Sequence, residues 1–316
     1  MFDGVLFFPI TPFTEDDTVD HEVLAEHLER GLSYGPGGIF IACGTGEYHA
    51  LSPSEFSAVV RTAALTTKGQ VPVFAGAGGP VALAKEMAVA AKEAGADGLL
   101  LLPPYLVGSP QSGLVDYVTA VAAVTDLPVI VYHRGNARFT VDSAVEVASF
   151  PTVIGFKDGV GDLDLMSRIV RAVLDSLADS GKPFQFFNGL PTAESSQAAY
   201  RAIGVPLYSS ATFAFAPLIA QAFYTSLEEG NTALTDALSR AFFHPLVALR
   251  DTVPGYAVSL VKAGAQLSGI RAGHVRPPLV DISAEDRVKL IAIIAAGNQV
   301  LADHGLASEP LALATA

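Results

Sequence analysis

The sequence predicts an α/β protein folded as a (β/α)₈ TIM barrel with a C-terminal helical region. Short apolar runs of β-type composition alternate with longer, alanine-rich helical stretches along residues 1–230. The apolar runs contain few polar residues, as expected for parallel strands that are covered on both faces. The alternative is a doubly wound open sheet, whose dinucleotide-binding form needs a glycine-rich turn after its first strand. Here that strand ends in Pro9–Phe13, so we favour the barrel.

Eight apolar runs are predicted to be strands, and eight is the number that closes this type of barrel. Their spacing leaves room for one helix after each strand. In chain order the predicted strands are Val5–Ile10, Gly38–Ala42, Val71–Ala75, Gly98–Leu102, Pro128–Tyr132, Val153–Lys157, Phe184–Asn188 and Val205–Tyr208.

Helical stretches between these strands carry recognisable start and stop signals. Ser52 is a predicted helix cap, with Pro53 at the first helical position and Glu55 completing a capping box. Gly95 marks the end of another helix just before a strand. The clearest predicted helices of this part are Pro53–Thr66, Val81–Ala94, Gly113–Val124 and Leu163–Leu177.

Residues 231–316 are predicted to form a helical region that packs on a catalytic barrel of residues 1–230. This part contains helical patterns at Thr232–Leu249, Tyr256–Leu267 and Ala284–Ala302, and no strand-like run. Pro277 and Pro278 separate the second pattern from the third, because proline interrupts a helix.

Composition and charge exclude several classes of protein. The 316 residues carry a net charge of −13, which disfavours binding to nucleic acids and to anionic membranes. No apolar run reaches the roughly 18 residues that span a bilayer. The N-terminus lacks the basic segment of a signal peptide, and Cys43, the single cysteine, cannot form an intrachain disulfide. We therefore expect a cytoplasmic protein.

Lys157 is the sharpest catalytic candidate. Active sites of these barrels lie at the C-terminal ends of the strands, and Lys157 alone among seven lysines ends a predicted strand. An apolar barrel mouth disfavours the ammonium and lowers the pKa of a lysine, and the neutral amine can attack a carbonyl carbon. From position alone, a lysine that reaches solvent or pairs with Asp158 is an equally good interpretation.

Other strand ends supply further candidates. Tyr132 closes the strand before Lys157 and could relay protons to the reacting centre, although a core tyrosine would have the same pattern. Gly44, Thr45 and Gly46 could hold a carboxylate through backbone N–H groups, unless they form a plain turn. The histidines show no HxH or HxxxH spacing, and no phosphate-binding loop is present. We therefore expect no metal and no cofactor.

Several short motifs occur in a fixed order along the chain. They are Phe8–Phe13, Gly44–Glu47, Pro103–Tyr105, Val131-Tyr132 and Gly155–Asp158. With this set the chain resembles the dihydrodipicolinate synthase / N-acetylneuraminate lyase family over nearly its whole length. The resemblance implies a TIM barrel that commonly assembles as a homo-oligomer, a tetramer or a dimer. It also implies a Schiff base between Lys157 and a 2-oxo acid, assisted by Tyr132.

Two departures from the synthase pattern indicate a different reaction. Gly44 stands where the synthase has a threonine, and Leu106 stands where it has a second tyrosine, so its proton relay is missing. The resemblance then favours a lyase that dehydrates and decarboxylates a six-carbon 2-oxo sugar diacid. The alternatives are an aldolase or a synthase-like enzyme of the same family, and a non-catalytic barrel that binds sugar acids.

The substrate's two carboxylates suggest roles for the remaining strand-end residues. Thr45, with Gly44 and Gly46, is predicted to hold the carboxylate beside the ketone. Arg134 is a candidate for the second carboxylate, although a structural ion pair would also explain an arginine there. The other predicted substrate contacts are Tyr105, Asn188, Ser209 and Ser210.

Overall fold

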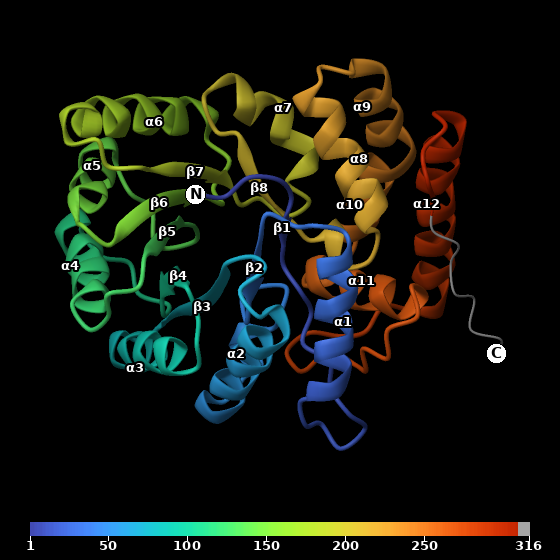
Figure 1. The fold of residues 1–316 in the computed structure, drawn as a ribbon, viewed down its shortest axis with the longest axis horizontal. Coiled ribbons are helices and arrows are strands. Elements are labelled where there is room, and N and C mark those ends of the chain that lie inside the picture. Colours follow the sequence, from blue (N-terminus) through green and yellow to red (C-terminus); the bar gives the residue numbers. More distant parts are fainter. Residues whose placement is uncertain (309–316) are drawn as a thin grey trace.

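The computed structural model describes residues 1–308 and shows a closed barrel of eight parallel strands in sequential order (Figure 1). The prediction of eight strands in a (β/α)₈ barrel is confirmed, with shifts at the strand ends. The strands are β1 (Leu6–Phe7), β2 (Gly38–Ile41), β3 (Val73–Gly79), β4 (Gly98–Pro104), β5 (Val129–His133), β6 (Val153–Asp158), β7 (Gln185–Asn188) and β8 (Leu207–Ser210).

One helix follows each strand and packs on the outside of the barrel. The predicted capping box is confirmed: the Ser52 hydroxyl accepts from the Glu55 N–H at 3.2 Å, and the Glu55 carboxylate accepts from the Ser52 N–H at 2.9 Å. The eight helices are α1 (His21–Ser33), α2 (Pro53–Thr67), α3 (Val81–Glu93), α4 (Gln111–Ala122), α5 (Val141–Ser149), α6 (Leu163–Leu177), α7 (Glu194–Ala202) and α8 (Pro217–Glu228).

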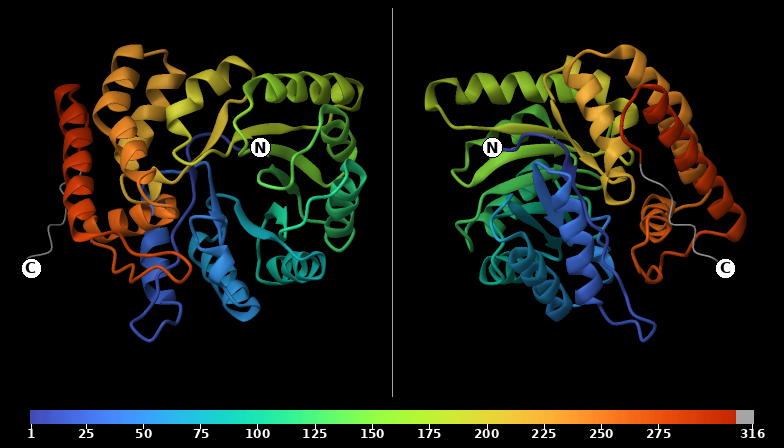
Figure 2. Two further views of the ribbon diagram at one scale, coloured as in Figure 1. Left: turned by 180° about the vertical axis from the view of Figure 1, so that it is seen from behind. Right: turned by 45° about the vertical axis from the view of Figure 1, so that its right-hand side comes forward.

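The remaining helices form a layer beside α8 (Figures 1 and 2). The predicted helix over 232–249 is interrupted by a π-helical turn at Ser239–Phe243. Gly297 of the last helix packs tightly against Ile219 of α8, because a Cβ there would lie 2.6 Å from the Ile219 side chain. The helices are α9 (Thr232–Leu238), α10 (His244–Arg250), α11 (Tyr256–Leu267) and α12 (Ala284–Asp303). The predicted region runs to residue 316, and its last eight residues lie outside those described.

Aromatic and aliphatic side chains fill the inside of the barrel. Phe2 packs edge-on against Phe74 and Phe187, with ring centroids 4.9 and 5.9 Å apart. The Phe8 and Phe40 rings are stacked at 4.6 Å. The inside of the barrel is therefore filled by a packed core, which leaves a ligand no channel along the barrel axis. Within residues 1–308, no helix combines the length and apolar character that crossing a membrane requires.

A buried ion pair joins the helical region to the loop after β2. The ammonium of Lys262 in α11 lies 2.7 Å from the Glu47 carboxylate, and both side chains are at most 1% exposed. The second Glu47 oxygen accepts from the backbone N–H of Arg276 at 2.8 Å. These contacts fix the loop that follows Gly44 and Thr45 against α11.

Glu47→Ala is expected to lower the free energy of unfolding by about 3–5 kcal/mol, because it leaves the Lys262 ammonium buried without its partner. Urea denaturation measures the change. Arg168→Ala is the matched control, since it breaks the exposed pair with Asp164 and should cost less than about 1 kcal/mol. Similar losses for the two variants would contradict a stabilising role of the buried pair.

Candidate active site

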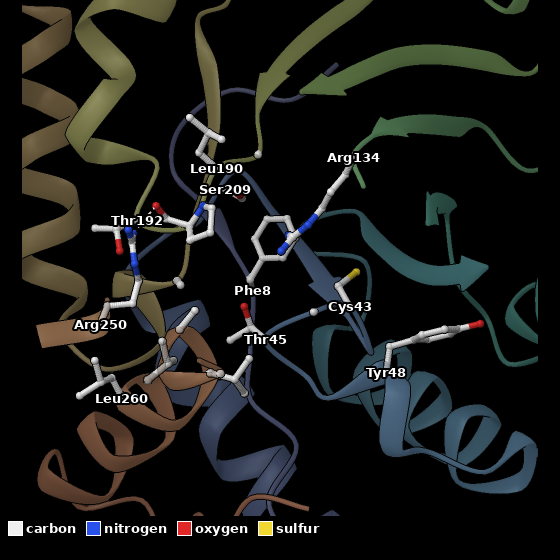
Figure 3. A pocket seen from close by; sticks show the side chains of 18 of the residues that line it. Phe8, Cys43, Thr45, Tyr48, Arg134, Leu190, Thr192, Ser209, Arg250 and Leu260 are labelled. Atoms are coloured by element: carbon white, nitrogen blue, oxygen red, sulfur yellow. Dashed lines mark hydrogen bonds between the residues drawn. The ribbon is translucent and has the colours of Figure 1, made fainter. Parts of the chain in front are cut away.

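A cavity of about 560 Å³ lies at the mouth of the barrel. Its walls come from the ends of the strands and from α10 and α11, so the helical region covers one side of the mouth. Figure 3 shows Phe8 and Thr45 between Arg134 on one side and Arg250 on the other. Of the predicted site residues, the cavity brings together Gly44, Thr45, Tyr132, Arg134, Lys157 and Ser209.

Lys157 reaches this cavity from β6, and its side chain is only 5% exposed. Its Nζ lies 4.2 Å from the centre of the Phe8 ring and 4.5 Å from that of Tyr132. It does not pair with Asp158, whose carboxylate accepts from the N–H groups of Val160 and Gly161. Burial lowers the pKa of Lys157 to about 7, so a large fraction of the amine is neutral near neutral pH.

We expect the rate of imine formation at Lys157 to rise with pH and to level off above about 7. The neutral amine is the attacking species, so below its pKa of about 7 the reactive fraction falls about tenfold per pH unit. Trapping with pyruvate and a hydride reductant measures this rate at each pH. A rate that keeps rising to about pH 10 would indicate the ordinary pKa of a lysine.

Tyr132 lies directly beside Lys157, since the two residues are register partners of β5 and β6. Its buried hydroxyl donates to the Gly189 carbonyl at 2.6 Å and accepts from Arg134 Nη1 at 2.9 Å. Burial raises the pKa of Tyr132, and the charge of Arg134 opposes that rise. A Cβ at Gly189 would lie 2.6 Å from the Lys157 side chain, so this close packing requires glycine.

The loop after β2 divides into two parts with different surroundings. Gly44 and Thr45 line the cavity, and their N–H groups donate to no acceptor among residues 1–308. Gly46 lies outside the cavity lining, and its carbonyl accepts from the Thr11 hydroxyl at 2.7 Å. A Cβ at Gly46 would lie 3.2 Å from the backbone of Ala42, which is tight packing. Two residues of the cavity lining therefore have N–H groups without a protein acceptor, and these groups are available to bind a carboxylate.

Three other predicted contacts do not line the cavity. Asn188 is buried and donates to the Ala193 carbonyl at 3.0 Å, and Ser210 is buried and donates to Glu194 at 2.6 Å. Tyr105 is 62% exposed in the loop after β4. Ser209 does line the cavity, from the end of β8.

Arg250 is a cavity residue that the sequence did not indicate. It ends α10, and its guanidinium donates to the Pro191 carbonyl at 2.7 Å and to the Asp251 carboxylate at 2.8 Å. Phe8, whose ring faces the Lys157 amine, was also missed, although it belongs to one of the motifs. No strand-end signal marks Arg250, because a helix outside the barrel repeats supplies it.

The charged side chains that line the cavity are basic. Lys157, Arg134 and Arg250 line it, and no Asp or Glu of residues 1–308 does. This is unusual in a chain with a net charge of −13, and it favours an anionic ligand. The same described residues contain no cluster of His, Cys, Asp and Glu that could hold a metal ion.

Fold and site together define an enzyme of the (β/α)₈ barrel class whose cavity contains a buried lysine of lowered pKa. The chain belongs to the dihydrodipicolinate synthetase family, whose model matches residues 1–297. The family resemblance predicted from the motifs is thereby confirmed.

The chain is similar to named proteins and to solved structures of this family. A probable 5-dehydro-4-deoxyglucarate dehydratase of Streptomyces griseus is 54% identical, over 96% of this chain and 94% of the relative. A protein of the same name from Paracidovorax citrulli is 44% identical, over 93% and 95%. Dihydrodipicolinate synthase from Oceanobacillus iheyensis superposes with a TM-score of 0.85 at 27% identity, over 94% and 97% of the two chains. The synthase from Aquifex aeolicus gives 0.82 at 26%, over 98% and 100%.

Proposed function

We propose that this protein is a decarboxylating 5-dehydro-4-deoxyglucarate dehydratase, which converts its substrate to 2,5-dioxopentanoate with loss of water and CO₂. Relatives at 42–54% identity carry the dehydratase name. The observation that carries the proposal is the cavity itself, where a buried lysine of lowered pKa shares the lining with two arginines and with no Asp or Glu of residues 1–308. Such a site suits a 2-oxo acid with two negative charges.

The reaction begins with attack of the Lys157 amine on the substrate ketone. The carbinolamine loses water and becomes an iminium ion, with Tyr132 moving the protons. A proton then leaves the neighbouring CH₂, because the electron pair it leaves behind delocalises onto the iminium nitrogen as an enamine. Hydroxide departs from the β-carbon as water after protonation, which gives a conjugated iminium.

Decarboxylation follows from this conjugated iminium. The distal carboxylate leaves as CO₂, and its bonding electron pair moves through the conjugated system to the nitrogen. Protonation, tautomerisation and hydrolysis release 2,5-dioxopentanoate and free Lys157. The lysine provides the electron sink, so the reaction requires no metal and no organic cofactor.

We assign the two carboxylates of the substrate to opposite sides of the cavity. The free N–H groups of Gly44 and Thr45 hold the carboxylate next to the ketone. Ser209 and the Nη2 of Arg250 hold the distal carboxylate until the dehydrated intermediate forms, while the Nε and Nη1 of Arg250 bind Asp251 and Pro191. Gly46, Asn188 and Ser210 support this arrangement from outside the cavity. Tyr105 is largely exposed to solvent in the single chain, so we assign it no contact with the substrate.

A product assay with 5-dehydro-4-deoxyglucarate tests the proposal. One equivalent of CO₂ and one of 2,5-dioxopentanoate are expected. Release of pyruvate would favour the aldolase, and binding without turnover would favour a sugar-acid sensor. A matched substrate with CH₂OH in place of the distal carboxylate should give no CO₂, because no leaving carboxylate remains.

We further propose that the protein acts in the cytoplasm as a homo-oligomer, either a dimer or a tetramer, as the family resemblance implies. Light scattering coupled to gel filtration measures the mass of the particle. A monomer at micromolar concentration would contradict the oligomeric part of the proposal.

A further inference from the structure

We propose that Arg134 is a positioning residue that holds the hydroxyl of Tyr132 and stabilises its phenolate form during proton transfer. This role serves imine formation with any 2-oxo acid, and not only the binding of a diacid. The inference rests on the proposed Schiff-base function. It differs from the interpretation that Arg134 holds the second carboxylate of the substrate.

The hydrogen bonds around the Tyr132 hydroxyl carry the inference. The hydroxyl proton points to the Gly189 carbonyl at 2.6 Å, and Arg134 Nη1 donates to the same oxygen at 2.9 Å. When Tyr132 gives up its proton, its oxygen keeps the donor from Arg134 and faces the lone pair of Gly189. Among residues 1–308, Arg134 is then the only hydrogen-bond donor to the phenolate. A charge-assisted bond of this kind is stronger than a neutral one.

The position of the guanidinium agrees with a contact to the hydroxyl. Its central carbon lies 5.6 Å from the centre of the Tyr132 ring. Arg134 forms no ion pair with a carboxylate of the described residues, so its charge is not neutralised by a protein group. The alternative interpretation, in which Arg134 forms a structural ion pair, is therefore not supported by the described residues.

The backbone of Arg134 is held in place by a tight turn. Arg134 and Ala137 exchange two backbone hydrogen bonds of 3.1 and 3.0 Å, and Gly135 between them has a φ of 61°. The Asn136 side chain ties the turn to the end of β4 through the Pro104 carbonyl at 3.0 Å. The side chain of Arg134 thus extends toward Tyr132 from a fixed point on the rim.

The positive charge of Arg134 favours the two protonation states that imine formation requires, a Tyr132 that releases its proton and a neutral Lys157. Arg134 lowers the pKa of Tyr132, against the larger effect of burial and the smaller effects of Asp158 and Cys43. It also adds to the effect of burial in lowering the pKa of Lys157, which Cys43 opposes. The nearby positive charge therefore helps Tyr132 to release a proton and Lys157 to remain neutral.

Pyruvate separates the two roles, because it is a 2-oxo acid without a second carboxylate. We expect Arg134→Gln to slow hydride trapping of the pyruvate adduct on Lys157 by about 10- to 100-fold, the scale for losing a hydrogen bond to a charged group. Arg134→Lys should restore part of the rate, since its ammonium can donate to the same oxygen. Arg138→Gln is the matched control: Arg138 donates to the Gly135 carbonyl of the same turn, and its loss should leave the rate unchanged.

A double-mutant cycle with Tyr132→Phe completes the test. Arg134→Gln should have no further effect on trapping when Tyr132 is already phenylalanine, because the two residues act as a unit. An unchanged pyruvate rate in Arg134→Gln, with a raised KM for the diacid, would overturn the inference in favour of carboxylate binding. Independent, multiplicative effects in the cycle would also overturn it. Failure of the unmodified protein to form any adduct would instead contradict the proposed function.

Discussion

Replacing Lys157 by alanine is expected to abolish adduct formation and to reduce turnover by about 10⁴-fold or more, the scale for removing a covalent nucleophile. Alanine has no amine to form the iminium, so neither the loss of water nor the loss of CO₂ has an electron sink. The fold should survive, because Lys157 forms no ion pair with a described residue and its Nζ lies over the rings of Phe8 and Tyr132, so its removal leaves no carboxylate unpaired. Product release and mass spectrometry of the borohydride-treated protein measure the two effects.

Lys92→Ala is a suitable control for this experiment. Lys92 is half exposed and pairs with Asp126 on the surface, whereas Lys157 is buried. This variant should retain full turnover, and peptide mapping should place the adduct on the fragment that contains Gly155–Asp158. An adduct on another lysine, or turnover by Lys157→Ala, would remove the basis of the proposed mechanism.

The Lys157–Tyr132 pair was predictable because it follows from local rules. Both residues end apolar runs in neighbouring repeats, and parallel strands bring their C-terminal ends to one side of the barrel. The first strand was less predictable. Val5–Ile10 is wholly apolar, yet only Leu6–Phe7 pairs with its neighbours. Pro9 cannot donate to a strand ladder, so the chain stays buried beyond Phe7 without belonging to the sheet.

The side-chain alternation of strands explains two strand-end residues that face away from the cavity. On β8, Leu207 and Ser209 face the barrel interior, and Ser210 faces the helices and bonds to Glu194. On β7, Phe187 faces inward and Asn188 outward, toward Ala193. A rule that selects every polar residue at the end of a strand, without considering this alternation, therefore selects both inward-facing and outward-facing residues. Assigning the inward face first would have separated Ser209 from Ser210.

Arg250 could not be predicted as a cavity residue for a different reason. It reaches the cavity only because α10 packs beside the barrel mouth, and this packing depends on contacts between residues distant in the chain. A helix pattern predicts that α10 exists, but it does not say which end of the barrel the helix approaches. The cation that we assign to the distal carboxylate was therefore found only in the folded chain.

Replacing Tyr132 by phenylalanine is expected to slow turnover by about 10²-fold or more, the usual scale for a positioned proton shuttle. The ring would still pack beside Lys157, so the variant should fold and bind substrate, with a loss of about 1 kcal/mol for the hydrogen bond to Gly189. Without the hydroxyl, the side chain that is the register partner of Lys157 can no longer carry protons to and from the carbinolamine. Stopped-time trapping and steady-state kcat measure the imine step and the whole reaction.

Tyr208→Phe is the matched control for this prediction. Tyr208 is also buried near the end of a strand, but its hydroxyl has no hydrogen-bond partner among residues 1–308 and it does not line the cavity. Its loss should leave kcat unchanged and should cost no stability, because no bond is broken. If the two variants reduce kcat equally, the effect at Tyr132 comes from packing of the barrel and not from proton transfer. If Tyr132→Phe leaves kcat unchanged, the protons of imine formation travel by another route, through water in the cavity.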